Sequence, residues 1–530
     1  MTAQNSPQQL MARVNQLASQ KQLTQALAAI KQVHNIYPKF APAWLTGAFL
    51  FFQNNQVDKA RQAIKKARKL EPDNTLYAFQ EVMMLDSINR PAEALPIAKE
   101  LAHTPLPNNN MNDQLARFLE INYAFKEAGL LFKHLSQTQP QHSGWFLKLA
   151  MIEQNFGHIE EAAKLAHQAL AVNNRDADTW FFLSHLKKQT PANNHINKLQ
   201  ELSQQQWDSA TDHSKIYFSL AKELEDIGQY KNSFQARQQA ADMYRGTFHY
   251  EVNSDRAFMQ QIQHEFDASF VKDCPYDAKQ QQPIFIVGLP RSGTTLLDRI
   301  ISSHSEVTAA GELKHFNRCL LSALQQQNHG QKLSRSELVS ASRQLDFKAL
   351  GQAYLDNAQT SRGDSPRFTD KFPQNSYYVA MILKALPGAK VIIMQRHPVS
   401  VCYSVFKQMF NHDSYPFSYN LEEMADYYIA HNELLNHWQK IGGDRVKTVY
   451  YEDLVADLET QARSVLSFLD LSWQDQCLEF HKNKQAAATA SASQVRQKVY
   501  TDSVAMWQNY ETELQPLITK LKTAGCLDDA

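Results

Sequence analysis

The chain has 530 residues, and Lys plus Arg equal Asp plus Glu at 54 each, so its formal net charge is zero. This balance excludes the basic excess of a general nucleic-acid binder and the acidic excess of a disordered tail, so any anion site must be local. Glycine accounts for only 16 residues, less than half of the usual share of ~7%, which argues against an all-β protein and favours helices.

The five cysteines lie far apart and include no Cys-x-x-Cys pair. We therefore expect buried thiols in a reducing compartment. The N-terminus is polar, and the sequence contains no uncharged apolar stretch of about 18 residues. These features predict a soluble, cytoplasmic protein with no membrane span and no nucleic-acid partner.

A 34-residue period fills the first half of the chain. Alanines in similar helical contexts recur in strict register at Ala26, Ala60, Ala94, Ala128 and Ala162. Prolines follow three of them by twelve residues, and aromatic residues come near the start of the next unit. The period predicts one helix pair per repeat, in which the small alanine lets the two helices approach closely.

This pattern resembles the tetratricopeptide repeat. The register slips after residue 190, where Ile196 takes the alanine position, and residues 228–240 look like a further, displaced unit. We place the array at residues 1–255. A repeat array is expected either to hold an acceptor peptide or protein, or to serve as a scaffold for homo-oligomerisation.

An anion-binding turn begins at residue 283. The apolar run 283–287 predicts a buried parallel strand, and residues 296–302 predict a helix. The connecting loop has glycines at both ends, and its anion-binding candidates are Arg291, Ser292, Gly293, Thr294 and Thr295. Such a loop at a helix N-terminus suits phosphate or sulfate.

The glycine spacing is that of a Walker loop, but Thr294 and Thr295 stand where a nucleotide-hydrolysing enzyme needs Lys followed by Ser or Thr. A transferring sulfuryl group carries less charge than a γ-phosphoryl group and can be held by loop amides, Arg291 and hydroxyls. A nucleotide-hydrolysing switch stays open as an alternative class.

The loop Pro-Arg-Ser-Gly-Thr-Thr-Leu-Leu resembles the 5′-phosphosulfate loop of sulfotransferases that use 3′-phosphoadenosine 5′-phosphosulfate (PAPS). Arg396 and Ser404 follow the strand-like run 390–395, and the resemblance implies that they hold the 3′-phosphate. Because Arg396 follows an apolar strand, it is also expected at the carboxyl edge of a parallel sheet. The run around Tyr451 resembles the tyrosylprotein sulfotransferases, which implies a nucleotide contact for that residue.

A general base is needed to take the proton from an acceptor hydroxyl. Glu312, beside Gly311, matches the catalytic glutamate of the tyrosylprotein sulfotransferases. His304, His315 and His397 are rival bases on chemical grounds.

Lys371 lies in the run Asp-Lys-Phe-Pro and resembles the lysine of the family motif Lys-Asp-Pro-Phe, which supports the leaving group. The order differs, so Asp370 is the alternative occupant of the matched position. A cation next to the leaving phosphate is what the transition state needs.

Near the C-terminus, Ser491 and Trp507 match family positions and imply a further nucleotide contact at Ser491. Met506 stands where the family has a lysine, directly before the tryptophan, so Arg496 or Lys498 would have to supply the cation. The small, polar residues 486–493 suggest a lid over the nucleotide.

Together these features predict an all-α tetratricopeptide solenoid at 1–255, a helical connector at 256–282, and an α/β P-loop-like sulfotransferase domain with a parallel sheet at 283–530. The expected reaction is sulfuryl transfer from PAPS to a hydroxyl, with protein tyrosine as one acceptor and with no metal. The alternatives are a carbohydrate or small-molecule sulfotransferase whose repeats serve oligomerisation, and a non-catalytic nucleotide-binding scaffold.

Overall fold

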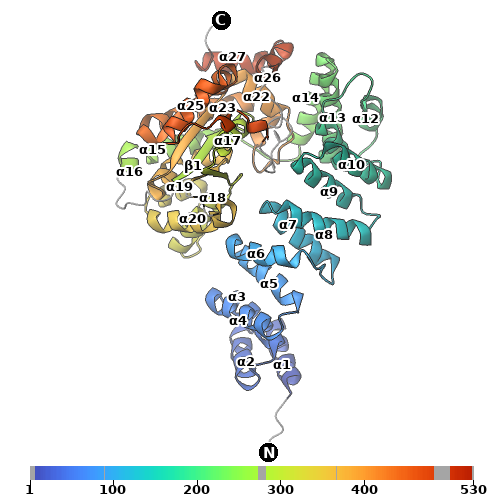
Figure 1. Cartoon of the computed structure of the whole chain (residues 1–530), viewed down its shortest axis with the longest axis vertical. Coiled ribbons are helices and arrows are strands. Elements are labelled where there is room, and N and C mark those ends of the chain that lie inside the picture. The colour runs from blue at the N-terminus through green and yellow to red at the C-terminus, as the bar shows by residue number, and fades with distance from the viewer. Residues whose placement is uncertain are drawn as a thin grey trace, which may run out of the picture. The chain divides into compact units, whose positions relative to one another are not determined.

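The computed structural model describes residues 6–88, 90–272, 282–363, 365, 367–482 and 502–527, and it divides into two compact units, Met1–Pro140 and Gln141–Ala530. Paired helices make up the described part of the first unit (Figure 1). In chain order they are α1 (Pro7–Ser19), α2 (Leu23–Ile36), α3 (Ala41–Gln53), α4 (Val57–Leu70), α5 (Thr75–Ser87), α6 (Pro91–Leu101), α7 (Asn109–Ile121) and α8 (Phe125–Thr138).

The repeat prediction is confirmed at its alanines. Each lies on the second helix of a pair and is 0% exposed, which is the close helix contact that the period requires: Ala26, Ala60, Ala94, Ala128 and Ala162. The aromatic positions also have a local role, since Trp44 Nε1 donates to the Pro38 carbonyl at 2.9 Å and ties a new helix to the turn before it.

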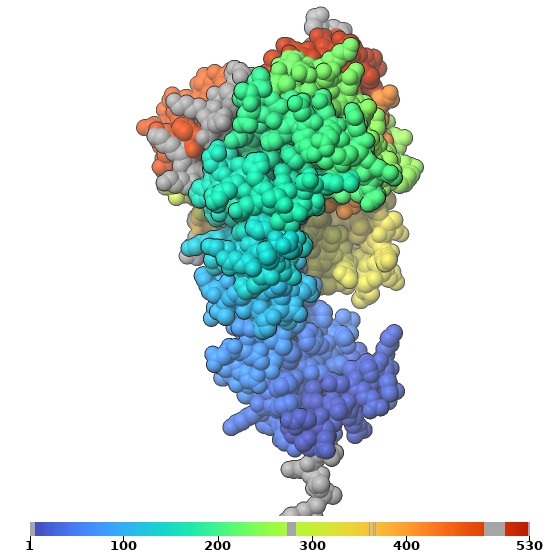
Figure 2. Space-filling model, turned by 90° about the vertical axis from the view of Figure 1, so that its right-hand side faces the viewer, coloured from blue at the N-terminus to red at the C-terminus, as the bar shows by residue number. Residues whose placement is uncertain are grey.

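The second unit begins with further helix pairs, which Figure 2 shows in teal and green at its front. They are α9 (Ser143–Phe156), α10 (Ile159–Val172), α11 (Ala177–Leu186), α12 (Ile196–Ser203), α13 (Ala210–Asp226) and α14 (Tyr230–Arg245), followed by α15 (Val252–Glu265) and α16 (Ala268–Lys272). The shortened α12 explains the slip in register, and α13–α14 is the displaced unit. The domain limits at residues 255 and 282 rest on the sequence patterns alone, and they stay a prediction.

A five-stranded sheet with the order β2-β3-β1-β4-β5 forms the centre of the second unit, and every neighbouring pair is parallel. The strands are β1 (Gln282–Gly288), β2 (Val307–Ala309), β3 (Arg367–Asp370), β4 (Lys390–Gln395) and β5 (Val446–Tyr450). The strands predicted at 283–287 and 390–395 are therefore present, and the predicted parallel sheet is confirmed. Strand order reverses at β1, where open α/β sheets bind their ligands.

Alternate residues of β1 pack into different layers, as the period of a strand requires. Ile284 and Ile286 face a core that includes residues of α17 (Thr294–Ser302) and α25 (Leu458–Phe468). Phe285 and Val287 face the larger core on the other side. Both faces of the strand are buried, which explains why its sequence is continuously apolar.

The helices beyond α17 complete the two layers. They are α18 (His315–Gln327), α19 (Arg335–Ser342), α20 (Phe347–Arg362), α21 (Val379–Ala385), α22 (Pro398–Phe406), α23 (Leu421–Ile441), α24 (Tyr451–Ala456), α26 (Asp502–Ala505) and α27 (Gln515–Thr523), with short 3-10 helices that include η1 (Pro373–Tyr377), η2 (Pro416–Tyr419) and η7 (Met506–Tyr510). None of the described helices has the length and apolar character needed to cross a bilayer.

Candidate active site

The predicted site residues gather at one edge of the sheet. Each strand is followed directly or within a few residues by one of them, in the order Arg291 after β1, Glu312 after β2, Lys371 after β3, Arg396 after β4 and Tyr451 after β5. Because the strands are parallel, their carboxyl ends lie on the same side. Five segments far apart in the sequence thus contribute to a single edge.

The loop after β1 depends on unusual backbone conformations. Gly288 has φ 147° and Gly293 has φ 102°, and Arg291 adopts the left-handed region at φ 67°. A Cβ on Gly288 would lie 2.3 Å from the Met394 carbonyl oxygen, and one on Gly293 would lie 2.5 Å from the Tyr451 ring. The two glycines are therefore required both by the curl of the loop and by its closeness to β4 and α24.

Helix α17 starts at the end of this loop, with Gly293 as its N-cap and Thr294 and Thr295 buried in its first turn. The Ser292 hydroxyl donates to the Leu289 carbonyl at 2.7 Å, which braces the loop internally. Helix N-termini carry a partial positive charge and present N–H groups. This turn therefore has the chemistry of an anion site.

Arg396 packs against the same loop. Its Nη1 donates to the Arg291 carbonyl at 3.1 Å, and its guanidinium lies 4.6 Å from the centre of the Tyr451 ring. Arg396 is 8% exposed, so the ring and the carbonyl orient a buried, permanently charged fork. The structure thus brings Arg291, Gly293, Arg396 and Tyr451 together.

His397 is held between two other elements. Its backbone N–H donates to Glu452 Oε1 at 3.0 Å, and its ring stacks on Trp507 with 5.2 Å between the ring centres. Burial lowers the pKa of His397, and the charge of Arg396 acts in the same direction, whereas Glu452 opposes it. The stacked imidazole shapes the wall next to Arg396, a role different from that of the rival base.

Glu312 and Lys371 form an ion pair. The Lys371 side chain is 3% exposed and that of Glu312 is 31% exposed, so the ammonium is buried while the carboxylate reaches the surface of the site. The backbone N–H of Lys371 also donates to the Gly311 carbonyl at 2.9 Å, which ties the end of β3 to the turn that presents Glu312.

Asp370 points to the other side of that turn. It is 0% exposed, and its carboxylate accepts the Leu313 N–H at 3.2 Å and the Tyr354 hydroxyl at 2.9 Å. Burial raises the pKa of Asp370 to about 7. Asp370 and Lys371 are the two candidates for the position of the family lysine. Lys371 contacts Glu312, whereas Asp370 anchors the backbone of Leu313, the residue after Glu312.

The two remaining histidines are engaged in structural roles or are poor bases. His304 Nε2 bonds to the Ser472 carbonyl at 2.9 Å, and its Nδ1 accepts the Glu306 N–H at 3.1 Å. His315 is buried at the start of α18, where burial, aided by the charge of Arg318, lowers its pKa to about 4. His315 therefore lacks the properties of a base poised near neutral pH, and both ring nitrogens of His304 are engaged in hydrogen bonds.

Two predicted residues are not joined to this group. Ser404 is half-buried on α22, and its hydroxyl forms no side-chain hydrogen bond with another described residue. Ser491 lies outside the described residues, as do the predicted lid at 486–493 and the cations Arg496 and Lys498.

One cation near the loop escaped the sequence reasoning. Lys407 is half-buried just beyond α22, and its Nζ donates to Glu225 Oε1 at 2.7 Å. Burial lowers the pKa of Lys407, and the charge of Arg291 contributes in the same direction, so the two cations lie within electrostatic range. Lys407 could have been found from the sequence, because it follows the predicted phosphate-binding residue Ser404 by three positions. Its partner Glu225, on α13, has no motif that marks it.

Glu225 also accepts hydrogen bonds from the hydroxyls of Tyr403 and Tyr510 at 2.8 Å and from Arg237 at 3.2 Å. Burial alone would raise its pKa, but Lys407 and Arg237 hold the pKa of Glu225 well below its ordinary value. The Glu225 carboxylate on α13 thereby binds Tyr403 and Lys407 at the end of α22, the helix that follows Arg396. Among the described residues, no group of three or more His, Cys, Asp and Glu is arranged to hold a metal ion.

Comparison with known proteins finds a family match in each of two regions. Residues 283–475 match the Sulfotransferase family, and residues 17–80 match the Tetratricopeptide repeat. The five strand ends and the loop lie inside the first match, and the helices α2 to α4 lie inside the second.

Relatives of this chain include an uncharacterized protein of Aquifex aeolicus, 29% identical over 402 residues that cover 75% of this chain and 52% of the relative. A protein-tyrosine sulfotransferase of Drosophila melanogaster is 26% identical over 244 residues, which are 44% of this chain and 48% of the relative. The chain thus spans about half the length of these relatives. The sulfotransferase domain of the Synechococcus PCC 7002 olefin synthase is 18% identical and covers 49% of this chain and 99% of its own, with a TM-score of 0.34.

Proposed function

We propose that this chain, which combines a tetratricopeptide-repeat region with a sulfotransferase domain, transfers a sulfuryl group from PAPS to an acceptor hydroxyl. The observation that carries the proposal is the meeting of an anion loop and a Glu312–Lys371 pair at one edge of a parallel sheet. The match to the Sulfotransferase family covers both features.

The residues at the loop suit the donor. Gly288 and Gly293 leave room that a Cβ would fill, and the α17 N-terminus with Thr294 and Thr295 would bind the 5′-phosphosulfate with Arg291. The buried guanidinium of Arg396 would bind the 3′-phosphate through paired hydrogen bonds. Ser404 on α22 would add a hydroxyl, and Lys407 just beyond that helix would add a positive charge. Tyr451, held under Arg396, would contact the nucleotide.

Glu312 and Lys371 would divide the chemistry. Glu312 accepts the proton of the acceptor hydroxyl as its oxygen bonds to sulfur. Lys371 balances the charge on the phosphate oxygen that keeps the electron pair of the broken sulfur–oxygen bond. A donor phosphate competes with Glu312 for the Lys371 ammonium, so donor binding would release the carboxylate to act as the base.

The acceptor and the setting belong to this proposal as well. Protein tyrosine is one acceptor, supported by the tyrosine-specific relatives, and the repeats would then hold the acceptor protein. A saccharide or small molecule, with the repeats serving homo-oligomerisation, is the alternative. The buried thiols of Cys402 and Cys477 fit a cytoplasmic location.

Calorimetry with 3′-phosphoadenosine 5′-phosphate (PAP), followed by a labelled-sulfate transfer screen over peptides, glycans and phenols, tests the proposal. We expect PAP to bind and at least one hydroxyl class to accept label in a reaction that Glu312→Ala abolishes. Absence of PAP binding would refute the donor assignment. PAP binding without transfer to any class would favour the non-catalytic scaffold, and magnesium-dependent ATP turnover would favour the hydrolysing switch.

A further inference from the structure

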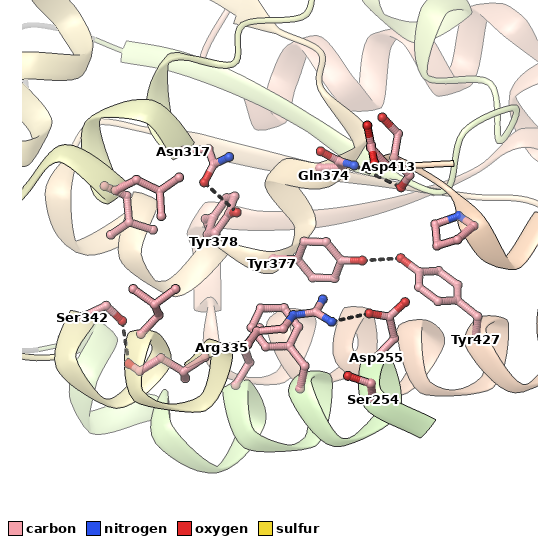
Figure 3. Close-up of a pocket in the computed structure, with 18 of the residues that line it drawn as sticks. Ser254, Asp255, Asn317, Arg335, Ser342, Gln374, Tyr377, Tyr378, Asp413 and Tyr427 are labelled. Atoms are coloured by element: carbon pink, nitrogen blue, oxygen red, sulfur yellow. Dashed lines mark hydrogen bonds and ion pairs between the residues drawn. The ribbon is translucent and has the colours of Figure 1, made fainter. Parts of the chain in front are cut away.

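A pocket of about 600 Å³ lies within the second unit (Figure 3). Its walls come from α15, α18, α19, η1, α21, η2 and α23, and none of the residues that line it is a predicted site residue. Pockets of this volume accommodate a compact organic molecule. A tyrosine side chain alone would leave most of the space unfilled.

The interior of the pocket is apolar. Buried side chains line it, namely Ile262, Phe266, Leu320, Leu324, Val339, Met381 and Phe417. The rings of Phe258 and Tyr377 pack edge to face with 5.5 Å between their centres, and Tyr378 adds a further ring to the wall. Aromatic walls of this kind favour an aromatic ligand, because rings pack well edge to face and offset.

Polar groups in the wall bond to one another. The Tyr377 and Tyr427 hydroxyls point toward one another and are hydrogen-bonded, and the Tyr378 hydroxyl donates to Asn317 Oδ1 at 3.0 Å (Figure 3). Asp255 pairs with Arg335. Because these groups already have hydrogen-bond or ion-pair partners in the wall, an apolar ligand can enter without leaving them unpaired.

The charged side chains of the wall other than Asp255 lie toward solvent. Glu251 and Asp413 are exposed, and the Arg335 side chain is 46% exposed while its guanidinium stacks on Phe258 at 3.8 Å. The pocket therefore has a charged rim and an apolar floor, the arrangement of a site that takes the apolar body of a small molecule.

Two segments that line the pocket run close to the proposed catalytic pair, Glu312 and Lys371, which are not themselves in its wall. Gln374 in its wall is three residues after Lys371, so their Cα atoms are at most about 11 Å apart. Ser414 and Pro416 also line the pocket, and Tyr415 lies between them. Burial raises the pKa of Tyr415, and the charge of Glu312 raises it further, which places this segment within electrostatic range of the carboxylate.

We infer that this pocket binds the aryl body of a small phenolic acceptor whose hydroxyl reaches Glu312. The inference rests on the proposed function for the reaction, but the pocket itself can be tested without turnover. It favours a free phenol over the tyrosine of a protein, which offers the same hydroxyl chemistry.

The test uses a matched pair of serine variants on α19. Ser342 is buried and lines the pocket, whereas Ser336 is exposed on the same helix and does not. Ser342→Phe should fill the pocket and Ser336→Phe should not. Binding of 2-naphthol to the full chain is measured by calorimetry, and sulfate transfer is measured with 2-naphthol, with phenol and with a tyrosine peptide.

We expect wild type and Ser336→Phe to bind 2-naphthol equally and Ser342→Phe to bind it at least about 10-fold more weakly. The KM for 2-naphthol should rise by a similar factor, while that for phenol changes less than about threefold. PAP binding, unchanged in both variants, shows that Ser342→Phe is folded.

Three results would overturn the inference: no 2-naphthol binding by wild type, equal binding by all three proteins, or transfer to the tyrosine peptide alone. Ser342-dependent 2-naphthol binding in a chain that does not bind PAP would refute the proposed reaction and leave the pocket assignment standing. If Ser342→Phe fails to fold, competition between 2-naphthol and a larger naphthol for one site of wild type decides: a single shared site supports the pocket, and independent sites refute it.

Discussion

The Lys371 ammonium is paired with the Glu312 carboxylate across 59 positions of sequence. The pair joins the segments after β3 and β2, so the proposed base and the proposed leaving-group cation hold each other in place. Their unequal exposure, 3% against 31%, gives them different tasks. The cation is positioned from within the domain, and the carboxylate faces outward.

Replacing the proposed base should separate chemistry from binding. Glu312→Gln keeps the size of the side chain but removes its basicity, so we expect sulfuryl transfer to fall by about 10²- to 10⁴-fold with PAP affinity retained. Initial rates and calorimetry measure the two effects. Glu306→Gln, at an exposed glutamate paired with Arg367, is the control and should leave the rate unchanged. A rate loss below tenfold in Glu312→Gln would contradict the role.

Asp370 should impose a pH dependence on stability. Because its pKa is raised to about 7 by burial, the folded protein binds a proton that the unfolded chain releases near pH 4. The free energy of unfolding should thus decrease by about 2 kcal/mol from about pH 5 to pH 7 on account of this group, and level off above that. Asp370→Asn should remove this decline.

Urea unfolding at several pH values measures the effect. Asp346→Asn is the control, since Asp346 caps α20 and asparagine caps helices equally well. An identical slope in Asp370→Asn and wild type would show that Asp370 does not take up the proton.

Gly293→Ala should damage the donor loop specifically. The new Cβ would meet the Tyr451 ring, and the residue would have to keep φ 102°. We expect PAP affinity to fall at least about 10-fold. Gly330→Ala has a similar positive φ of 78° but nothing within 4 Å of its Cβ. It should cost stability without changing PAP affinity, and equal effects of the two variants would count against the loop assignment.

Arg396→Lys should weaken recognition of the 3′-phosphate. Lysine keeps the charge but loses the planar fork and its position over Tyr451. We therefore expect the preference of the protein for PAP over AMP, measured by calorimetry, to fall by about 10-fold or more. Arg463→Lys, at an arginine stacked on Trp473 at 3.8 Å, is the control. An unchanged preference in Arg396→Lys would place the 3′-phosphate elsewhere.

Glu225→Gln should destabilise the second unit. The change leaves the buried Arg237 and the half-buried Lys407 without their counter-charge, and breaking a buried ion pair typically costs about 3–5 kcal/mol. Urea unfolding measures the loss. Glu201→Gln disrupts an exposed pair with Lys198 and should cost less than about 1 kcal/mol. Equal losses would mean that the buried cluster is not a stabilising network.

Local patterns in the sequence predicted much of this molecule. The repeating alanines, among them Ala26 and Ala60, revealed helix pairs because close helix packing demands a small residue at a constant spacing. Gly288 and Gly293 revealed the anion loop because its backbone curl excludes other residues. The strand before Arg396 placed that arginine at a sheet edge. Each of these signals depends on a few neighbouring residues, so it can be read along the chain.

Tertiary structure decided the contacts between distant segments. Asp370 and Lys371 look equivalent in sequence, but the parallel pairing of β2 with β3 turns Lys371 toward Glu312 and buries Asp370. Glu225 and Lys407 carry no motif and meet only because α13 packs against the end of α22. The aromatic pocket is likewise assembled from several helices. Such partners are chosen by packing in three dimensions, which a one-dimensional pattern does not record.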